Sequence, residues 1–383
     1  MKTEKIILMI FLLSAFTFLG AQDKIKKTHS FQVSKDGELE LYANPGEITV
    51  DTWDKNEVVV KLRGDEEDYD LRNVKIEQRN NKVIVKYDSH WGWSEGIDLV
   101  ITLPKNFNAS INTTGGDVQF RNDINGKITI STSAGDISMA NVSGDLSLNT
   151  QGGDIRLRDV NGNIDVNTQG GEIRIGKING KSARINTMGG DIDISSIGSD
   201  AKVKTYGGEI RIGDVDGNAE VITFGGDIEL GNVGGSVNME TYGGNLSLKS
   251  AKGDVEASTY AGDINLRNIK GSIKAKTNAG NITAELFPTG KNRSVLKTSN
   301  GEVTLYLPEN AKADIEAAIR VRGWWKQMKD DFQIKSDFPG STNKFNEDEK
   351  EISAHYSING GGEKITISTF NSSIKIKKIR SGN

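Results

Sequence analysis

A short motif that returns at an almost constant interval constrains the fold of this chain more than any other feature. It is a pair of small residues, the second always glycine, followed by an acid or an amide. The second residue recurs at steps of 18 or 19 residues, with one last step of 21, at Gly116, Gly135, Gly153, Gly171, Gly190, Gly208, Gly226, Gly244, Gly262, Gly280 and Gly301. A period of this size is typical of one supersecondary unit stacked on itself. The sequence therefore predicts a solenoid.

The residues within one repeat predict strands. Ile155 and Leu157 alternate with arginines, and Ile164 and Val166 alternate with polar residues. This period of two indicates two short, half-buried strands in each coil. The glycines at the junctions are expected to supply the positive φ of tight turns. Since no helix-length apolar pattern lies between coils, each strand should stack on its counterpart in parallel sheets, about 4.8 Å apart.

The predicted fold class is therefore all-β, a single-stranded parallel β-helix (β-solenoid) with about 18 residues per coil. The left-handed hexapeptide helix has coils of similar length, but its apolar residues should recur at every sixth position. Ile155, Leu157, Val160 and Ile164 do not follow that spacing, which favours a right-handed solenoid. A β-hairpin insertion is expected near the N-terminus, where Val74 to Lys86 alternates around an Asn-Asn turn.

Four segments are expected along the chain. Residues 1–21 have two lysines, an apolar run and small residues at the end, as a signal peptide does. Residues 22–110 should form N-terminal strands, a first coil and the hairpin cap, and residues 111–308 the regular repeats. Residues 309–383 should form C-terminal coils with a tryptophan-containing loop and a cap. The signal predicts export to the periplasm or the cell surface, with no integral membrane span after its cleavage.

Composition excludes several kinds of site. The chain has no cysteine, so disulfides, thiolate metal sites and a cysteine nucleophile are absent. Its 48 basic and 52 acidic side chains are interspersed, without the basic stripe of a nucleic-acid-binding protein. The three histidines are scattered. We therefore expect no nucleic-acid partner, no catalytic residue, no metal site and no cofactor.

Several motifs besides the repeats point to a known family. They are Pro45-Gly46-Glu47-Ile48-Thr49-Val50 with Trp53, Ser336-Asp337-Phe338-Pro339 and the closing Gly360-Gly361-Gly362-Glu363-Lys364-Ile365. Together with the doublet repeats they resemble the bacterial putative adhesin family, a domain of unknown function in envelope proteins. The resemblance covers nearly the whole chain after the signal and implies a β-solenoid at or outside the membrane. It implies no reaction, and the family has no catalytic motif to carry over.

Stacking turns each repeat position into a column of side chains. A threonine stands two residues before each small pair, with the parity of the buried residues, and its hydroxyl should bond along the stack or to the turn backbone. The acid after the pair is expected to bond local backbone rather than calcium, because calcium-binding rolls use a different, nonapeptide pattern. The alternating Arg, Asp and Glu of the next outward column should offset repulsion between like charges.

Aromatic residues supply the candidate binding site. Immediately before the small pair stand Tyr206, Phe224, Tyr242 and Tyr260, one residue after the inward threonine, so these rings should point outward. Such a strip suits docking of sugar rings or a partner chain, although neighbouring rings could also only stabilise one another. Trp91, Trp93, Trp324 and Trp325 lie in loops that either bind a ligand or cover an end of the solenoid.

These observations favour an exported, non-catalytic β-solenoid that presents an elongated surface to an envelope glycan or a protein partner, as an adhesin does. We expect a monomeric rod. Two alternatives remain open: a polysaccharide lyase or hydrolase, and a structural spacer of the cell envelope. A deep groove with an acid cluster would favour the enzyme, and a uniformly convex, charged surface would favour the spacer.

Overall fold

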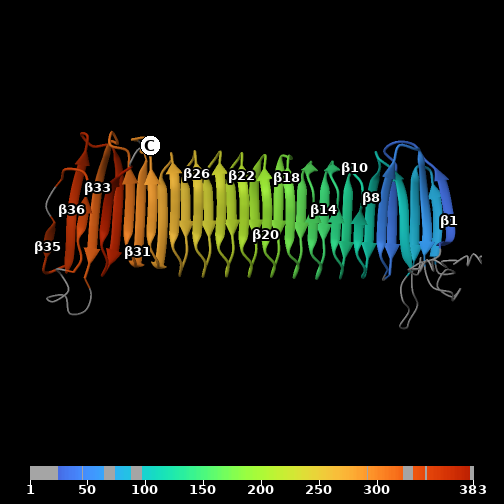
Figure 1. Cartoon of the computed structure of the whole chain (residues 1–383), viewed down its shortest axis with the longest axis horizontal. Helices are drawn as coiled ribbons and strands as arrows, with labels where there is room; N and C mark the ends of the chain where they lie inside the picture. The colour runs from blue at the N-terminus through green and yellow to red at the C-terminus, as the bar shows by residue number, and fades with distance from the viewer. Residues whose placement is uncertain are drawn as a thin grey trace, which may run out of the picture.

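The chain forms a long rod of stacked strands (Figure 1). The computed structural model describes residues 25–44, 46–63, 74–87, 97–290, 292–321, 331–340 and 343–379. The expected signal peptide lies outside these residues. Strands cross the rod from one long edge to the other, with the N-terminal strands at one end and β33, β35 and β36 at the other. The described residues contain no helix, so the predicted all-β class is confirmed.

One long sheet, here called sheet A, forms one face of the rod. Three short strands at the corner of the early coils extend it: β10 (Ile124–Asn125), β13 (Val142–Ser143) and β16 (Val160–Asn161). In spatial order its other strands are β1 (Ile25–Gln32), β4 (Glu57–Arg63), β7 (Asp98–Pro104), β3 (Ile48–Trp53), β9 (Val118–Phe120), β12 (Ile137–Met139), β15 (Ile155–Leu157), β18 (Ile173–Ile178), β20 (Ile192–Ile197), β22 (Ile210–Val215), β24 (Ile228–Val233), β26 (Leu246–Ala251), β28 (Ile264–Ile269), β30 (Ile282–Leu286), β32 (Val303–Leu307), β38 (Ile374–Lys378) and β34 (Ile334–Ser336).

A second sheet, sheet B, runs parallel to the first along the rod. In spatial order its strands are β5 (Val74–Arg79), β6 (Lys82–Tyr87), β2 (Glu38–Ala43), β8 (Asn108–Thr113), β11 (Ile128–Thr132), β14 (Leu146–Asn149), β17 (Ile164–Asn167), β19 (Ser182–Asn186), β21 (Asp200–Lys204), β23 (Ala219–Ile222), β25 (Val237–Glu240), β27 (Val255–Ser258), β29 (Ile273–Ala279), β31 (Arg293–Asn300), β37 (Glu363–Phe370), β33 (Ala313–Arg320), β36 (Glu351–Ile358) and β35 (Lys344–Asn346).

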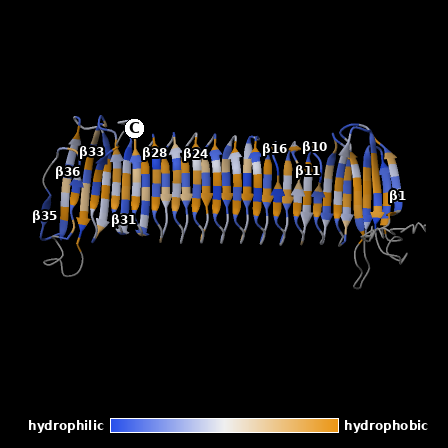
Figure 2. Ribbon diagram, viewed as in Figure 1, coloured by the Kyte–Doolittle hydropathy of each residue, from blue (hydrophilic) through white to orange (hydrophobic). Residues whose placement is uncertain are grey.

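The register places like side chains above one another. Ile137 pairs with Ile155 and Ile155 with Ile173 in sheet A, while Leu146 pairs with Ile164 in sheet B. These aliphatic columns are buried between the two sheets, and apolar and polar residues alternate along the strands in Figure 2. Burial of each such side chain contributes about 1.5 to 3 kcal/mol. The core is therefore a thin, continuous layer that extends along the whole rod.

The N-terminal end is closed by a rearranged chain path. Strands β2 and β3 form a coil that lies between β6–β7 on the outer side and β8–β9 on the inner side. The expected hairpin is present: β5 runs antiparallel to β6 at the edge of sheet B. Strand β4, although its sequence alternates like that of a coil, does not stack as one. It pairs antiparallel with β1 and β7, and so covers the open edge of sheet A.

The C-terminal end uses the same device. The last coil, β37–β38, lies between β31–β32 and β33–β34 instead of at the tip of the rod. In Figure 1 the C-terminus accordingly lies inside the end formed by β33, β35 and β36. Beyond β33, β36 and β35 add two antiparallel strands to sheet B. Such additions protect parallel edges that another chain could otherwise extend.

The second glycine of each doublet is required for close packing. Among these glycines, the expected positive φ is present only at Gly116, Gly135, Gly280 and Gly301. Gly153, Gly171 and Gly208 do not have a left-handed φ. A Cβ on Gly208 would lie 2.1 Å from the carbonyl oxygen of Gly190 in the preceding coil, whereas a Cβ on Gly207 would lie 3.5 Å from its nearest neighbour. This difference explains why alanine occupies the first position of some doublets and never the second.

The threonine column is structural, as the sequence predicted. All its members are buried. The hydroxyl of Thr223 donates to the carbonyl of Gly208 in the preceding coil at 2.8 Å and accepts the N–H of Gly226 in its own turn at 3.4 Å. The same arrangement recurs at Thr205 and Thr241. These buried hydroxyls are therefore satisfied and link one turn to the next. At the start of the stack Thr113 and Thr132 instead donate within their own turns, to the carbonyls of Gly115 and Ala134.

Candidate functional site

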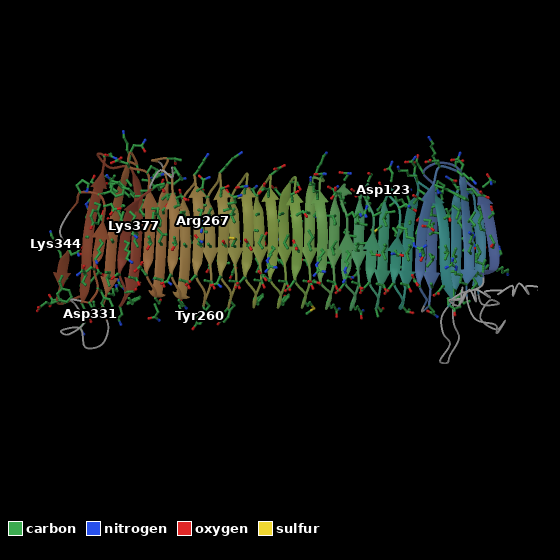
Figure 3. The ribbon with its side chains drawn as sticks, viewed as in Figure 1. Asp123, Tyr260, Arg267, Asp331, Lys344 and Lys377 are labelled. Carbon is green, nitrogen blue, oxygen red and sulfur yellow. The ribbon has the colours of Figure 1, made fainter. Side chains whose placement is uncertain are left out.

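The four predicted aromatic residues form an exposed line along one edge of the rod, here called the aromatic ridge. Their relative exposures are 58% for Tyr206, 54% for Phe224, 61% for Tyr242 and 51% for Tyr260. Met188 precedes them in the same column and is also exposed. Figure 3 shows Tyr260 at one long edge of the rod and Asp123 at the other. Five of the seven large apolar side chains exposed in the described part of the chain thus share one column.

The rings of the ridge stack in two pairs. The centroids of Tyr206 and Phe224 lie 5.0 Å apart with an interplanar angle of 2°, and those of Tyr242 and Tyr260 lie 5.0 Å apart at 3°. Stacked pairs of this kind contribute about 0.5 to 1.5 kcal/mol beyond their burial. Each ring therefore has one face covered by its neighbour. The ridge is an apolar strip in which each stacked pair acts as a unit.

A shallow hollow of about 330 Å³ adjoins the ridge on the sheet B side. Its walls include the rings of Tyr206, Phe224 and Tyr242 together with Lys204, Ile222 and Glu240 at the ends of β21, β23 and β25. The last three residues are consecutive members of one outward column, so a cation, an aliphatic side chain and a carboxylate stand in a row beside the rings. The rings and Ile222 thus form an apolar surface, with the positive charge of Lys204 at one end of the row and the negative charge of Glu240 at the other.

The other predicted candidates, Trp91, Trp93, Trp324 and Trp325, lie outside the described residues. Within the described ranges, no three His, Asp or Glu side chains gather as a metal site would require. Those ranges likewise include no helix of the length and apolarity needed to cross a membrane. The ridge is therefore the predicted site that the structure describes.

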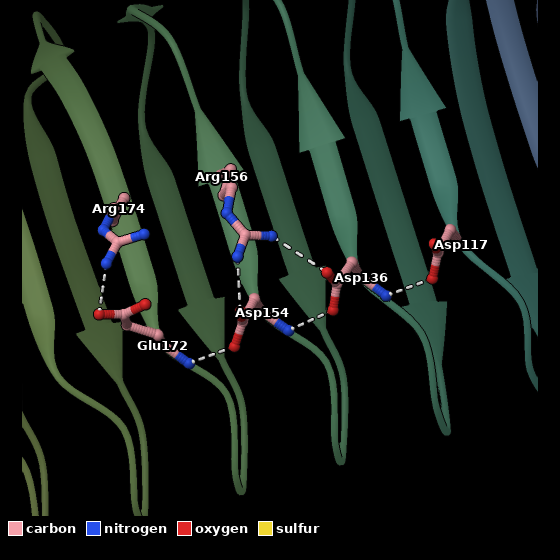
Figure 4. A network of polar contacts seen from close by, with 6 residues as sticks. All are labelled: Asp117, Asp136, Asp154, Arg156, Glu172 and Arg174. Atoms are coloured by element: carbon pink, nitrogen blue, oxygen red, sulfur yellow. Dashed lines mark hydrogen bonds and ion pairs between the residues drawn. The ribbon is translucent and has the colours of Figure 1, made fainter.

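The acid column bonds backbone, but across coils rather than locally. The main-chain N–H of Asp136 donates to Oδ1 of Asp117 at 2.8 Å, that of Asp154 to Oδ1 of Asp136 at 2.9 Å, and that of Glu172 to Oδ1 of Asp154 at 2.9 Å (Figure 4). The same bond joins Glu209 to Asp191, Asn245 to Asp227, Asp263 to Asn245, Asn281 to Asp263 and Glu302 to Asn281. The side chain of an aspartate or asparagine at this position therefore links its own turn to the next one by a hydrogen bond.

Glutamates interrupt this ladder and bind arginine instead. Oε1 of Glu172 accepts from Arg174 at 2.7 Å, and Oε2 of Glu209 accepts from Arg211 at 2.7 Å. Glutamate has one more methylene than aspartate, which moves its carboxylate away from the backbone of the next coil. Among the described residues, no N–H of the acid column donates to the carboxylate of Glu172 or Glu209. Arg156 bridges Asp136 and Asp154 at 3.0 and 2.7 Å (Figure 4). The arginines of this column therefore neutralise neighbouring carboxylates, in line with the charge-offset interpretation.

Two further ladders were missed from the sequence. At the corner before sheet B, the N–H of Asn218 donates to Asp200 at 2.7 Å and that of Ser236 donates to Asn218 at 2.8 Å. On the same edge of the rod, near the C-terminal ends of β22 and β24, the N–H of Asn232 donates to Asp214 at 2.9 Å. Asp or Asn side chains that recur every 18 residues, such as Asp123, Asn141 and Asp159, were the signal that could have revealed them.

We expect chelators to leave the melting temperature unchanged, because the aspartate Oδ1 atoms of the acid column already accept backbone N–H groups. Asp191→Ala should lower the free energy of unfolding by about 1 kcal/mol, whereas Asp191→Asn should be nearly neutral because its amide oxygen can accept the same bond from Glu209. Thermal melts with and without EDTA test the expectation. A fall of more than a few degrees on chelation would contradict it.

Comparison with known proteins agrees with the resemblance inferred from the sequence. Three solved structures are similar: a putative cell adhesion protein from Clostridium sporogenes ATCC 15579 (9% identity, 92% of this chain and 99% of that chain covered, TM-score 0.16), a putative adhesin from Bacteroides fragilis NCTC 9343 (12%, 94% and 98%, 0.23) and a putative lipid binding protein from Parabacteroides distasonis ATCC 8503 (12%, 92% and 96%, 0.21). With TM-scores this low, they carry no argument about function. No curated protein matches significantly.

The family match is extensive. Residues 37–259 and 217–321 match the model of the family described as Toastrack DUF4097. These ranges include β2 to β33 and the whole regular stack. They amount to well over half of the 383 residues. The chain therefore belongs to the Toastrack DUF4097 family.

Proposed function

We propose that this chain is an exported, non-catalytic β-solenoid that binds an envelope ligand or a partner protein along its elongated surface, as an adhesin does. The aromatic ridge is the observation that carries the proposal. Exposed large apolar side chains are normally scattered singly over a protein surface, and contiguous ones mark interaction sites. Here they follow one another in register on a rigid edge, with Lys204 and Glu240 beside them.

The stacking favours a protein partner at the ridge. A sugar ring packs on an aromatic face, but in each stacked pair one face of each ring is already covered by its neighbour. Ring edges and tyrosine hydroxyls suit a packed protein surface, in which tyrosine is enriched. With the export signal expected in residues 1–21, the proposed encounter is in the periplasm or at the cell surface, and the proposed form of the rod is a monomer.

Glu220, on the outer side of sheet B, is unsuited to act as a general acid. Hydrogen bonds from Lys202 and then Lys204 hold the pKa of Glu220 below its ordinary value. A general acid at neutral pH needs the opposite shift. The ridge and its hollow also distinguish this surface from the uniformly convex, charged surface expected of a spacer.

A ridge variant tests the proposal. Phe224→Ala combined with Tyr242→Ala removes one ring from each stacked pair, and Phe224→Tyr is its conservative control. Immobilised protein should retain a partner from solubilised envelopes when it is wild type or Phe224→Tyr, and lose it in the double alanine variant. Thermal melts should differ by only a few degrees, because the rings contribute modestly to folding. Equal retention by all three proteins, or a double variant that melts far below wild type, would make the ridge purely structural.

A further inference from the structure

A groove follows the outer side of sheet B near the corner opposite the aromatic ridge. One hollow of about 920 Å³ extends from Lys181 to Arg293, and a second of about 430 Å³ extends from Lys127 to Arg184. The two share Lys181, Ser182 and Arg184 in their walls. They therefore form one continuous groove along the rod, which passes over strands from β11 to β31.

The corner ladder fixes one wall of the groove. It includes Asp200 and Asn218, whose side chains are held close to the backbone by their cross-coil bonds. The inward column of sheet B beneath the groove is aliphatic throughout, so the floor is a continuous strand surface. Its members are Ile128, Leu146, Ile164, Ala183, Ala201, Ala219, Val237 and Val255.

The charges along the groove are balanced. Its walls include six basic side chains, namely Lys127, Lys181, Arg184, Lys202, Lys274 and Arg293. They also include six acidic ones, namely Asp145, Asp165, Asp200, Glu220, Asp254 and Glu256. Lys202 pairs with Glu220 at 2.9 Å, and Lys274 pairs with Glu256. A polyanion would meet as many carboxylates as cations, so the groove has no net attraction for it.

The backbone direction favours a sugar polymer over a peptide. The groove follows the rod axis, whereas the strands cross it, so the N–H and C=O groups of sheet B point along the groove and are bonded to the adjacent coils. A peptide lying there would find no main-chain partners, which extended peptides need for recognition by strand addition. Sugar hydroxyls both donate and accept, and the amide, hydroxyl and charged side chains of the walls can pair with them.

We propose that this groove binds a linear, uncharged polysaccharide segment that lies along the rod axis, each sugar spanning about one coil. The inference extends the binding role proposed above to a second surface and does not depend on the ridge. Because each coil contributes one strand to the floor of the groove, a longer oligosaccharide contacts more coils, and affinity should rise with its length. Because the walls carry equal numbers of basic and acidic side chains and the proposed ligand is uncharged, binding should change little with salt.

The test uses the purified full-length exported chain and calorimetric titration with N-acetylglucosamine oligomers of two, four and six sugars. Asn238→Trp fills the groove from an exposed outward position of β25 that lines it. Ser247→Trp, at the outward position of the neighbouring strand β26 on sheet A, is the matched control. We expect affinity to increase with length, to fall at least about tenfold in Asn238→Trp, and to remain within about twofold in Ser247→Trp.

Three results would overturn the inference: no heat with the hexamer at millimolar concentration, tighter binding of a hexamer of galacturonate, or unchanged affinity in Asn238→Trp. The combined Phe224→Ala and Tyr242→Ala variant separates the two surfaces. It should bind the N-acetylglucosamine hexamer as wild type does while losing its envelope partner. Loss of sugar binding in that variant would move the glycan site to the ridge and refute the groove.

Discussion

Gly208→Ala should be among the most damaging single substitutions in this chain. The added Cβ would lie 2.1 Å from the carbonyl oxygen of Gly190, and that oxygen belongs to the backbone of the adjacent coil. Neither coil can move without lengthening the hydrogen bonds that Thr205 and Thr223 make between turns. Overpacking typically costs about 1 to 3 kcal/mol and sometimes more, and here we expect the upper end of that range. Urea unfolding followed by circular dichroism measures the change.

The neighbouring glycine provides the matched control. Gly207→Ala meets its nearest atom at 3.5 Å, and its φ is not left-handed. It should be neutral or stabilise the fold by up to about 1 kcal/mol, because alanine reduces the freedom of the unfolded chain. Ala134, Ala261 and Ala279 already occupy equivalent positions. Similar unfolding midpoints for the two variants would show that the coils tolerate a methyl group at the contact, and would refute the close-packing explanation.

Removal of residues 363–383 should disrupt the C-terminal end completely rather than shorten the rod. The deleted strands β37 and β38 separate β31–β32 from β33–β34. They bury Ile365, Ile367, Ile374 and Ile376, each of which contributes about 1.5 to 3 kcal/mol. Without them, parallel edges are exposed on both sides of the gap. We expect aggregation on size-exclusion chromatography and rapid proteolysis of residues 309–362.

Two point variants separate this effect from a general loss of chain. Ile367→Asp places a carboxylate in the core at a fully buried position and should reproduce the truncation. Ser368→Asp, on the outer side of the same strand, should leave the protein monodisperse. If the truncated protein remains a stable monomer, β37 and β38 do not hold the C-terminal end together.

The regular part of the fold was predictable because its physics is local and repeated. The doublet period and the alternation around Ile155 and Ile164 were sufficient for parallel stacks with the threonines inside. The aromatic column was likewise predictable, since a ring that follows an inward threonine must point outward. What a single repeat cannot encode is contact between coils. The role of Gly208 against Gly190, and the bond from Asn218 to Asp200, become visible only when two turns are superposed.

The ends were less predictable for a different reason. The strand patterns of Glu57 to Val60 and of Lys364 to Ile376 resemble those of any coil, and alternation says nothing about the neighbour that a strand selects. Insertion of β2–β3 and β37–β38 between other coils depends on pairing partners far apart in sequence. The groove could not be predicted either, because its walls combine side chains from many successive coils.

The insertion of the last coil also determines when the molecule can be completed. The strands that separate β31–β32 from β33–β34 are synthesised after both of these pairs. Strands β33 and β34 must therefore wait, or pair provisionally, until β37 and β38 are present. Long-range pairing of this kind is slow. Folding of the rod should thus have a late, rate-limiting closure at this end, and the parallel edges that β37 and β38 cover are open to aggregation until then.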